Sequence, residues 1–177
     1  MRIISGTHKG KRLMAPKNLP VRPTTDFAKE ALFNILQNRI DFDEVSVLDL
    51  FAGTGNISFE FASRGTHDIV SVDAHVGCIK YIQKIAEELS FPIKPFRSDV
   101  YKYVSAPHNS FDIIFADPPY DFDSQLLQTL VEKIFENNLI KTEGFLIIEH
   151  SKYTDLSSID HFSESRKYGG STFSFFD

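Results

Sequence analysis

Short apolar runs alternate with amphipathic helical segments along most of this chain, and this alternation constrains the fold more than any other feature. It is typical of parallel strands joined by helical crossovers. The runs predicted as strands are residues 45–50, 69–73, 93–97, 111–116 and 144–149. Helices are predicted where apolar residues recur at helical spacing, over residues 56–64, 78–89 and 126–135.

The pattern changes after residue 149. Two further strand-like runs, 162–167 and 172–176, are joined through Tyr168, Gly169 and Gly170 with no helix between them, which predicts a hairpin. We therefore expect an α/β fold, a Rossmann-like sandwich with a mostly parallel seven-stranded sheet and a C-terminal antiparallel hairpin. Ligands of such sheets bind at the carboxyl ends of the strands.

The N-terminal segment has a different character. Residues 2–5 and 11–15 are short strand-like runs around His8, Lys9 and Gly10, which predicts a small β-hairpin. An amphipathic helix follows, with Thr25 or Asp26 as its N-cap. Its predicted apolar face consists of Phe27, Ala28, Ala31, Leu32, Ile35 and Leu36.

The composition limits the classes of protein to which this chain could belong. The 177 residues are 42% hydrophobic, which suits a single domain with one core, and we expect one domain over residues 1–177. No stretch approaches the roughly 18 consecutive apolar residues of a membrane span, so the expected location is the cytoplasm and no membrane partner is expected. With one cysteine, Cys78, and no histidines at zinc-ligand spacing, no metal site is expected.

Charge is unevenly distributed along the chain. The net charge is -5, but residues 1–25 contain six Lys and Arg and no Asp or Glu, which leaves -11 for residues 26–177. We expect a basic arm over residues 1–25, followed by a core over residues 26–177 that contains the reactive residues. A charge run by itself is most simply a solvated tail, and a basic arm can also bind nucleic acid.

A glycine-containing loop, Asp49-Leu50-Phe51-Ala52-Gly53-Thr54-Gly55-Asn56, follows the first predicted strand. Glycines let the backbone turn tightly and approach a ligand at the start of the next helix. Asp73 ends the second strand 18 residues after Gly55, the spacing of a carboxylate that binds ribose hydroxyls. An adenosine-containing cofactor is therefore predicted, with Ser98 and Asp99 placed to bind an adenine edge. The alternative for Asp73 is a helix-capping carboxylate.

The segment Asp117-Pro118-Pro119-Tyr120 directly follows a predicted buried strand. Consecutive prolines fix two φ angles and remove two donors, so the carbonyl groups are held as acceptors. Hydrogen bonds from an exocyclic amine to Asp117 and to the Pro118 carbonyl would aim the nitrogen lone pair at a methyl donor. Tyr120 would stack on the base. The alternative is a rigid loop with a surface tyrosine.

Together these segments resemble the RsmD family, guanine-N2 methyltransferases of 16S ribosomal RNA. The matching pieces are residues 2–6 (RIISG), 9–13 (KGKRL), 22–26 (RPTTD), 49–55 (DLFAGTG), 63–65 (SRG) and 117–120 (DPPY). The 22–26 segment is the specific one, because many amine methyltransferases share the others. Two departures are Asp73, where relatives often have Glu, and the segment 27–30 (FAKE), where they tend to have more Arg.

The resemblance implies a class I S-adenosylmethionine-dependent methyltransferase that acts on 16S ribosomal RNA or the small ribosomal subunit. A monomer is expected on a separate ground, because the predicted domain leaves no apolar face uncovered. The implied cofactor-binding residues are Asp49, Phe51, Gly53, Gly55, Asn56, Asp73, Ala74, Asp99 and Val100. The implied catalytic residues are Asp117, Pro118, Pro119 and Tyr120. The implied RNA-binding residues are Lys9, Lys11, Arg12, Arg22 and Thr24, which favours RNA binding over a solvated tail for the arm.

Three other functions remain open from the residues alone. A nicotinamide-dependent oxidoreductase would share the glycine loop and Asp73, but no tyrosine is followed by lysine four positions later. A non-catalytic RNA-binding assembly factor would not need the intact loop together with Asp73 and Asp117. Methylation of adenine N6 or of a protein glutamine would use the same Pro-Pro-Tyr chemistry, and Asp117 in place of Asn favours guanine by resemblance only.

Overall fold

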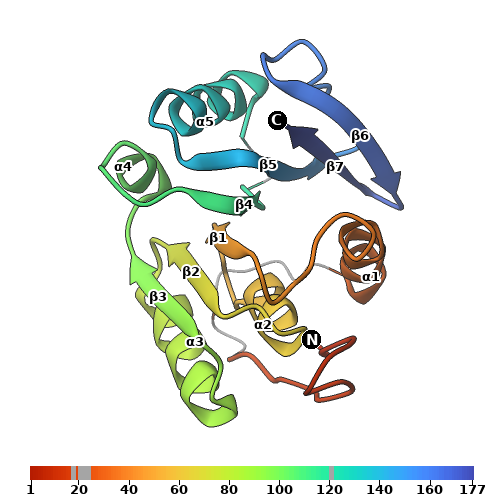
Figure 1. The fold of residues 1–177 in the computed structure, drawn as a ribbon, viewed down its shortest axis with the longest axis vertical. Coiled ribbons are helices and arrows are strands. Elements are labelled where there is room, and N and C mark those ends of the chain that lie inside the picture. The colour runs from red at the N-terminus through yellow and green to blue at the C-terminus, as the bar shows by residue number, and fades with distance from the viewer. Residues whose placement is uncertain (17–18, 20–24, 120–121) are drawn as a thin grey trace.

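The computed structural model describes residues 1–16, 19, 25–119 and 122–177. These residues form a seven-stranded sheet in the order β3-β2-β1-β4-β5-β7-β6 (Figure 1). The strands are β1 (Ser46–Leu50), β2 (Asp68–Asp73), β3 (Ile93–Arg97), β4 (Phe111–Ala116), β5 (Ile140–Ser151), β6 (Phe162–Tyr168) and β7 (Ser171–Phe176). The seven strand regions predicted from residue 45 onward are all confirmed, two of them with the predicted bounds.

Strands β1 to β5 pair in parallel, whereas β7 pairs antiparallel with both β5 and β6. The hairpin expected at the C-terminus is therefore present, and its second strand lies between β5 and β6. This arrangement confirms the predicted α/β fold with a mostly parallel sheet. It also places the start of β7 beside the carboxyl end of β5, because Ser151 pairs with Ser171.

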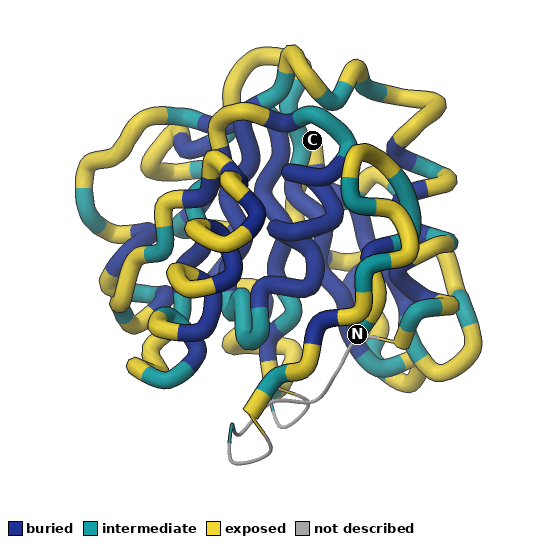
Figure 2. The backbone as a smooth tube through the Cα atoms, turned by 90° about the horizontal axis from the view of Figure 1, so that it is seen from below, coloured by how far each residue is buried: buried dark blue, intermediate teal, exposed yellow. Residues whose placement is uncertain are grey.

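Five helices cover the two faces of the sheet in the described residues: α1 (Asp26–Leu36), α2 (Asn56–Ser63), α3 (Val76–Leu89), α4 (Val100–Val104) and α5 (Ser124–Glu136). Apolar residues of α1, α2 and α3 form one core cluster with one face of the sheet, and those of α4 and α5 form a second cluster with the other. The central strands are accordingly buried (Figure 2). No helix in the described ranges has the length and apolar character to cross a membrane.

Helix α1 begins where the sequence predicts, with Thr25 as N-cap accepting from the amide of Ala28 at 3.1 Å. Its predicted apolar face is partly wrong, because Phe27 is 65% exposed whereas Phe33 and Lys29 are buried. The face is rotated because Phe33 packs edge-on against Phe61 and because the Lys29 ammonium reaches an internal carboxylate, Glu60, at 3.3 Å.

The N-terminal hairpin is reduced to one antiparallel bridge, between Arg2 and Arg12, supported by hydrogen bonds such as Ile3 N to Lys11 O at 3.0 Å. It is fixed to helix α2, where Glu60 accepts from the amides of Ile4 and Ser5 at 2.8 and 3.0 Å. Residues 1–13 therefore pack against the body of the protein, and the solvated-tail interpretation is wrong for them.

Candidate active site

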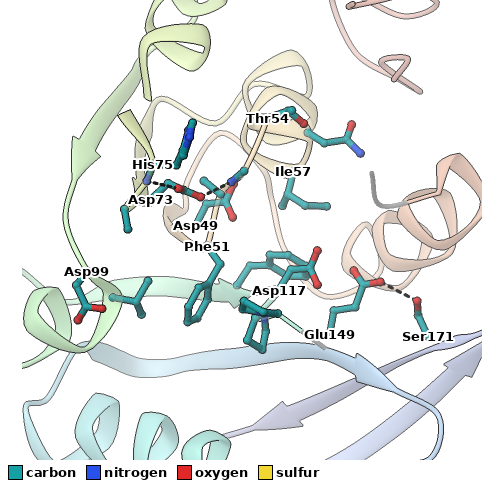
Figure 3. A pocket seen from close by; sticks show the side chains of 18 of the residues that line it. Asp49, Phe51, Thr54, Ile57, Asp73, His75, Asp99, Asp117, Glu149 and Ser171 are labelled. Atoms are coloured by element: carbon teal, nitrogen blue, oxygen red, sulfur yellow. Dashed lines mark hydrogen bonds between the residues drawn. The ribbon is translucent and has the colours of Figure 1, made fainter. Parts of the chain in front are cut away.

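A cavity of about 520 Å³ lies at the carboxyl ends of the parallel strands (Figure 3). Its volume falls in the range of small-molecule sites. The lining residues are Thr25, Asp49, Phe51, Ala52, Gly53, Thr54, Asn56, Ile57, Asp73, Ala74, His75, Asp99, Val100, Phe115, Asp117, Pro118, Pro119, Glu149 and Ser171. Of the cofactor-binding residues implied by the family resemblance, only Gly55 is absent from this lining.

The glycine loop turns with three residues at positive φ, namely Phe51 (58°), Gly53 (54°) and Gly55 (75°). Gly55 is the N-cap of α2, and a Cβ there would lie 2.9 Å from Cγ1 of Ile82. The glycine at this position is thus required by backbone conformation and by packing against α3. Gly53, by contrast, lines the cavity, where its amide donates to Asp73 Oδ2 at 2.8 Å.

The Asp73 carboxylate is fixed at the end of β2 by two backbone amides. Gly53 N donates to Oδ2, and His75 N donates to Oδ1 at 2.7 Å. The N-cap of α3 is His75, whose Nδ1 accepts from Gly77 N, so the helix-capping interpretation of Asp73 is wrong. Each carboxylate oxygen has more than one acceptor site, so this orientation is compatible with binding two ribose hydroxyls.

Asp99 has a structural role that was not predicted from the sequence. Its Oδ1 accepts from Lys102 N at 3.0 Å and caps helix α4. This five-residue helix is too short to produce a detectable apolar period. Asp99 and Val100 line the cavity, whereas Ser98 does not and instead donates from Oγ to the Asp99 carbonyl at 2.9 Å.

Asp49 is the most buried acid of the cavity wall, with 2% of its surface exposed. Its Oδ2 accepts from Ser58 Oγ at 2.5 Å and from Ser58 N at 3.2 Å. Burial raises the pKa of Asp49 to about 7, and the nearby Asp73 charge adds to the increase, while the Ser58 hydrogen bonds oppose it. The carboxyl group therefore titrates near neutral pH.

Asp49→Asn is expected to flatten the fall in stability between pH 3.8 and about 7. In that window the folded protein holds a proton that the unfolded chain has released, so stability decreases as pH rises, by up to about 1.4 kcal/mol per unit. The asparagine keeps an acceptor for Ser58 and does not titrate. Urea denaturation of both proteins across the window measures the effect, and a constant difference in the free energy of unfolding would contradict the assignment.

Asp117, Pro118 and Pro119 follow β4 and line the cavity. Figure 3 shows Asp117 between Asp99 and Glu149. The Asp117 amide donates to the Leu50 carbonyl at 3.4 Å, which links this segment to the end of β1. Tyr120 lies outside the described residues. The segment thus places a carboxylate and a proline-fixed carbonyl in one cavity with Asp73 and Asp99.

Glu149 and Ser171 also line the cavity and were not predicted. Glu149 is 3% exposed, and its Oε1 accepts from Ser171 Oγ at 2.7 Å. The rule that ligands bind at strand ends could have found Glu149, because it closes the predicted strand 144–149. Ser171 had no such signal, because it begins a strand.

Lys9, Lys11 and Arg12, the predicted RNA-binding residues that the structure describes, are not among the residues that line the cavity. Lys9 and Arg12 are exposed on the N-terminal hairpin, and Lys11 pairs with Glu88 of α3 at 3.1 Å. Arg22 and Thr24 lie outside the described residues. Among the residues that the structure describes, no group of three or more His, Cys, Asp or Glu side chains is placed to hold a metal ion.

The sheet order, with one antiparallel strand beside β5, and the cavity at the strand ends define a class I methyltransferase, the class that uses S-adenosylmethionine. A family model described as "Conserved hypothetical protein 95" matches residues 1–177. The chain belongs to this family, the RsmD family, which confirms the resemblance noted in the sequence.

Relatives and solved structures agree with this membership. The chain is 35% identical to YlbH of Bacillus subtilis over 88% of this chain and 85% of that protein. It is 30% identical to the Haemophilus influenzae ribosomal RNA small subunit methyltransferase D over 86% and 79% of the two chains. The Escherichia coli protein yhhF has the same fold, with a TM-score of 0.84 at 21% identity over 99% and 96%.

A more distant structure has the same fold together with bound ligands. It is a T. thermophilus 16S rRNA N2 methyltransferase, RsmC, in complex with AdoMet and guanosine. The TM-score is 0.72 at 21% identity, over 90% of this chain and 45% of that chain.

Proposed function

We propose that this protein transfers the methyl group of S-adenosylmethionine to the exocyclic N2 amine of a guanine in 16S ribosomal RNA. The main support is the position of Asp117 and Pro118 in the cavity, with Asp73 and Asp99 toward its other end (Figure 3). The names of the relatives support a ribosomal RNA substrate. The name of RsmC and its guanosine ligand support guanine N2 as the target.

The residues of the cavity fit the proposed cofactor. Asp73 would bind the ribose hydroxyls through its amide-fixed carboxylate, and Asp99 with Val100 would flank the adenine. The glycine-loop backbone, with Phe51, Ala74, Asn56 and Asp49, would surround the rest of the molecule. Gly55 would act indirectly, by allowing the turn that brings Gly53 to the cavity.

Catalysis would depend mainly on positioning. S-adenosylmethionine supplies a methyl group that is already activated by its sulfonium. Asp117 and the Pro118 carbonyl would accept the two N–H groups of the amine, which localises the nitrogen lone pair and directs it toward the methyl group. Asp117 would then take the proton that the nitrogen loses. Pro119 would keep the loop rigid, and Tyr120 would stack on the base.

Residues 1–25 would form the RNA-contacting arm and residues 26–177 the catalytic core. The hairpin is held on α2 by Glu60, so its exposed cations keep a fixed position relative to the cavity. Lys9, Lys11 and Arg12 would contact RNA phosphates, and Arg22 and Thr24 would also bind RNA. Since residues 26–177 have a charge of -11, binding to free RNA would depend steeply on salt.

Changing Lys9, Lys11 and Arg12 together to alanine is expected to weaken RNA binding about tenfold and to lower the salt slope by about two. Filter binding or anisotropy over a salt series measures both quantities. The matched control changes three lysines away from the hairpin, Lys80, Lys94 and Lys133, to alanine. Equal losses in the two triple variants would mean that RNA binding depends on overall charge and not on the hairpin.

The proposed reaction is tested by transfer of radiolabelled methyl from S-adenosylmethionine to 16S RNA and to small subunits that lack their base methylations, followed by nucleoside analysis. Label in N2-methylguanosine is expected. Label in N6-methyladenosine would support the proposed mechanism but would show that adenine, and not guanine, is the target. No label on any RNA, despite measured cofactor binding, would favour a protein-glutamine substrate or a non-catalytic assembly factor.

A further inference from the structure

Glu149 is the cavity carboxylate that neighbours Asp117 (Figure 3). Strands β4 and β5 pair in parallel with Ala116 opposite Ile148, so Asp117 and Glu149 are the next residues on two adjacent strands. Both side chains reach the same cavity, and Figure 3 shows them as neighbours. A target amine held by Asp117 would therefore bring the adjoining edge of its base to Glu149.

The Glu149 carboxylate is held in a fixed orientation. Ser171 Oγ donates to its Oε1 at 2.7 Å, and Ser171 is itself fixed by the pairing of β7 with β5. Burying a carboxylate at 3% exposure costs stability unless hydrogen bonds or opposite charges compensate for the lost water. A buried, oriented acceptor inside a binding cavity is suited to recognising a donor group on a ligand.

Glu149 lies toward the substrate end of the cavity. Asp73 and Asp99, the proposed ribose and adenine contacts, lie on the far side of Asp117 from Glu149 (Figure 3). Thr25, at the start of α1, lines the cavity along with Ser171. The donor of the methyl group and the base that receives it would thus occupy opposite sides of Asp117.

Guanine and adenine present different groups to such a carboxylate. The Watson–Crick edge of guanine has two neighbouring donors, the N1–H and the N2 amine, and an ionised carboxylate only accepts. Adenine has an unprotonated N1 beside its amine, and this lone pair would face the carboxylate oxygen. Enzymes that take a base out of its stack commonly recognise it by hydrogen bonds to this edge.

We propose that Glu149 determines specificity for guanine by accepting the N1–H of the target base, while Asp117 and the Pro118 carbonyl hold the N2 amine. This role rests on the proposed function. It gives a physical reason for guanine N2 over adenine N6, a choice that the Asp-Pro-Pro segment alone leaves open. Ser171 is a positioning residue in this arrangement, because it orients Glu149 without contacting the base.

The test compares Glu149→Gln with Ser171→Ala. The glutamine has the same shape but can turn an NH₂ group toward the N1–H donor, so kcat/KM for 16S RNA should fall about 100-fold, with the dissociation constant of S-adenosylmethionine within about twofold of wild type. Ser171→Ala should lose less than about tenfold, the effect of one neutral hydrogen bond. Equal losses in the two variants would reduce Glu149 to a structural partner of Ser171 and overturn the proposal.

A matched pair of ligands tests the contact itself. Guanosine and 1-methylguanosine, which lacks the N1–H, are compared as competitive inhibitors of RNA methylation. Wild type should prefer guanosine by about tenfold or more, and Glu149→Gln should abolish this preference. An unchanged preference in the variant would overturn the proposal. If wild type does not produce N2-methylguanosine, the proposed function fails instead, whatever the variants do.

Discussion

Asp117→Ala is expected to lower kcat for methyl transfer by about 1000-fold or more, with the affinity for S-adenosylmethionine nearly unchanged. The variant removes the acceptor that positions the amine and takes its proton. It leaves the proposed cofactor contacts at Asp73 and Asp99 intact, because these lie toward the other end of the cavity. Single-turnover transfer to RNA measures the first effect, and calorimetry with the cofactor measures the second.

Asp117→Asn is the matched control, because it retains one acceptor oxygen in a side chain of the same shape. It should keep part of the activity, about 10-fold to 100-fold below wild type. If Asp117→Ala instead lost cofactor binding, Asp117 would have a structural or cofactor-binding role, and the proposed assignment of the catalytic residue would be wrong.

Lys29→Met is expected to destabilise the fold by about 3–5 kcal/mol, the typical result of breaking a buried ion pair from one side. The Lys29 side chain is 1% exposed, and its ammonium donates to the Arg2 carbonyl at 2.6 Å and to Asn56 Oδ1 at 2.8 Å, beside Glu60. Burial lowers the pKa of Lys29, and the Glu60 carboxylate opposes this shift. Without the ammonium, Glu60 keeps Arg64 as its cation but loses a fully buried partner.

Urea denaturation of Lys29→Met measures this loss, with Lys84→Met on the exposed surface of α3 as the matched control. The control should change the free energy of unfolding by less than about 0.5 kcal/mol. The Lys29 variant should also weaken cofactor binding, because Asn56 lines the cavity. A Lys29 variant as stable as the control would mean that Arg64 and the backbone amides alone satisfy Glu60.

The strands could be predicted because the apolar runs that indicate them are local features of the sequence. Residues 111–116 form a mostly apolar and buried run, and they coincide with β4. Residues 93–97 coincide with β3, an edge strand that is mostly exposed and whose apolar signal is weaker. Strand β5 begins at Ile140, four residues earlier than predicted. Its first part is irregular, with a register shift between Phe111 and Ile113 in the pairing with β4 and a φ of +67° at Glu143. The polar residues Lys141 to Glu143 in this irregular part conceal the strand from a search for apolar runs.

The parts of the site that lie at the carboxyl ends of parallel strands could be predicted from the sequence. Asp73 ends a parallel strand, Asp99 and Asp117 come directly after two others, and such ends converge on one edge of a sheet. Ser171 reaches the same edge only because β7 runs antiparallel to β5, a pairing that joins residues about 20 positions apart. The Lys29–Glu60 pair is equally non-local, so a lysine that sequence alone places on a helix surface lies in the interior.

The most direct measurement is nucleoside analysis of 16S RNA from cells that lack this protein, compared with the same cells supplied with wild type or with Asp117→Ala. Loss of N2-methylguanosine in the deletion, restored by wild type and not by the variant, is the predicted result. An unchanged content of N2-methylguanosine, together with loss of a different methylated nucleoside, would contradict guanine N2 as the target of this cavity.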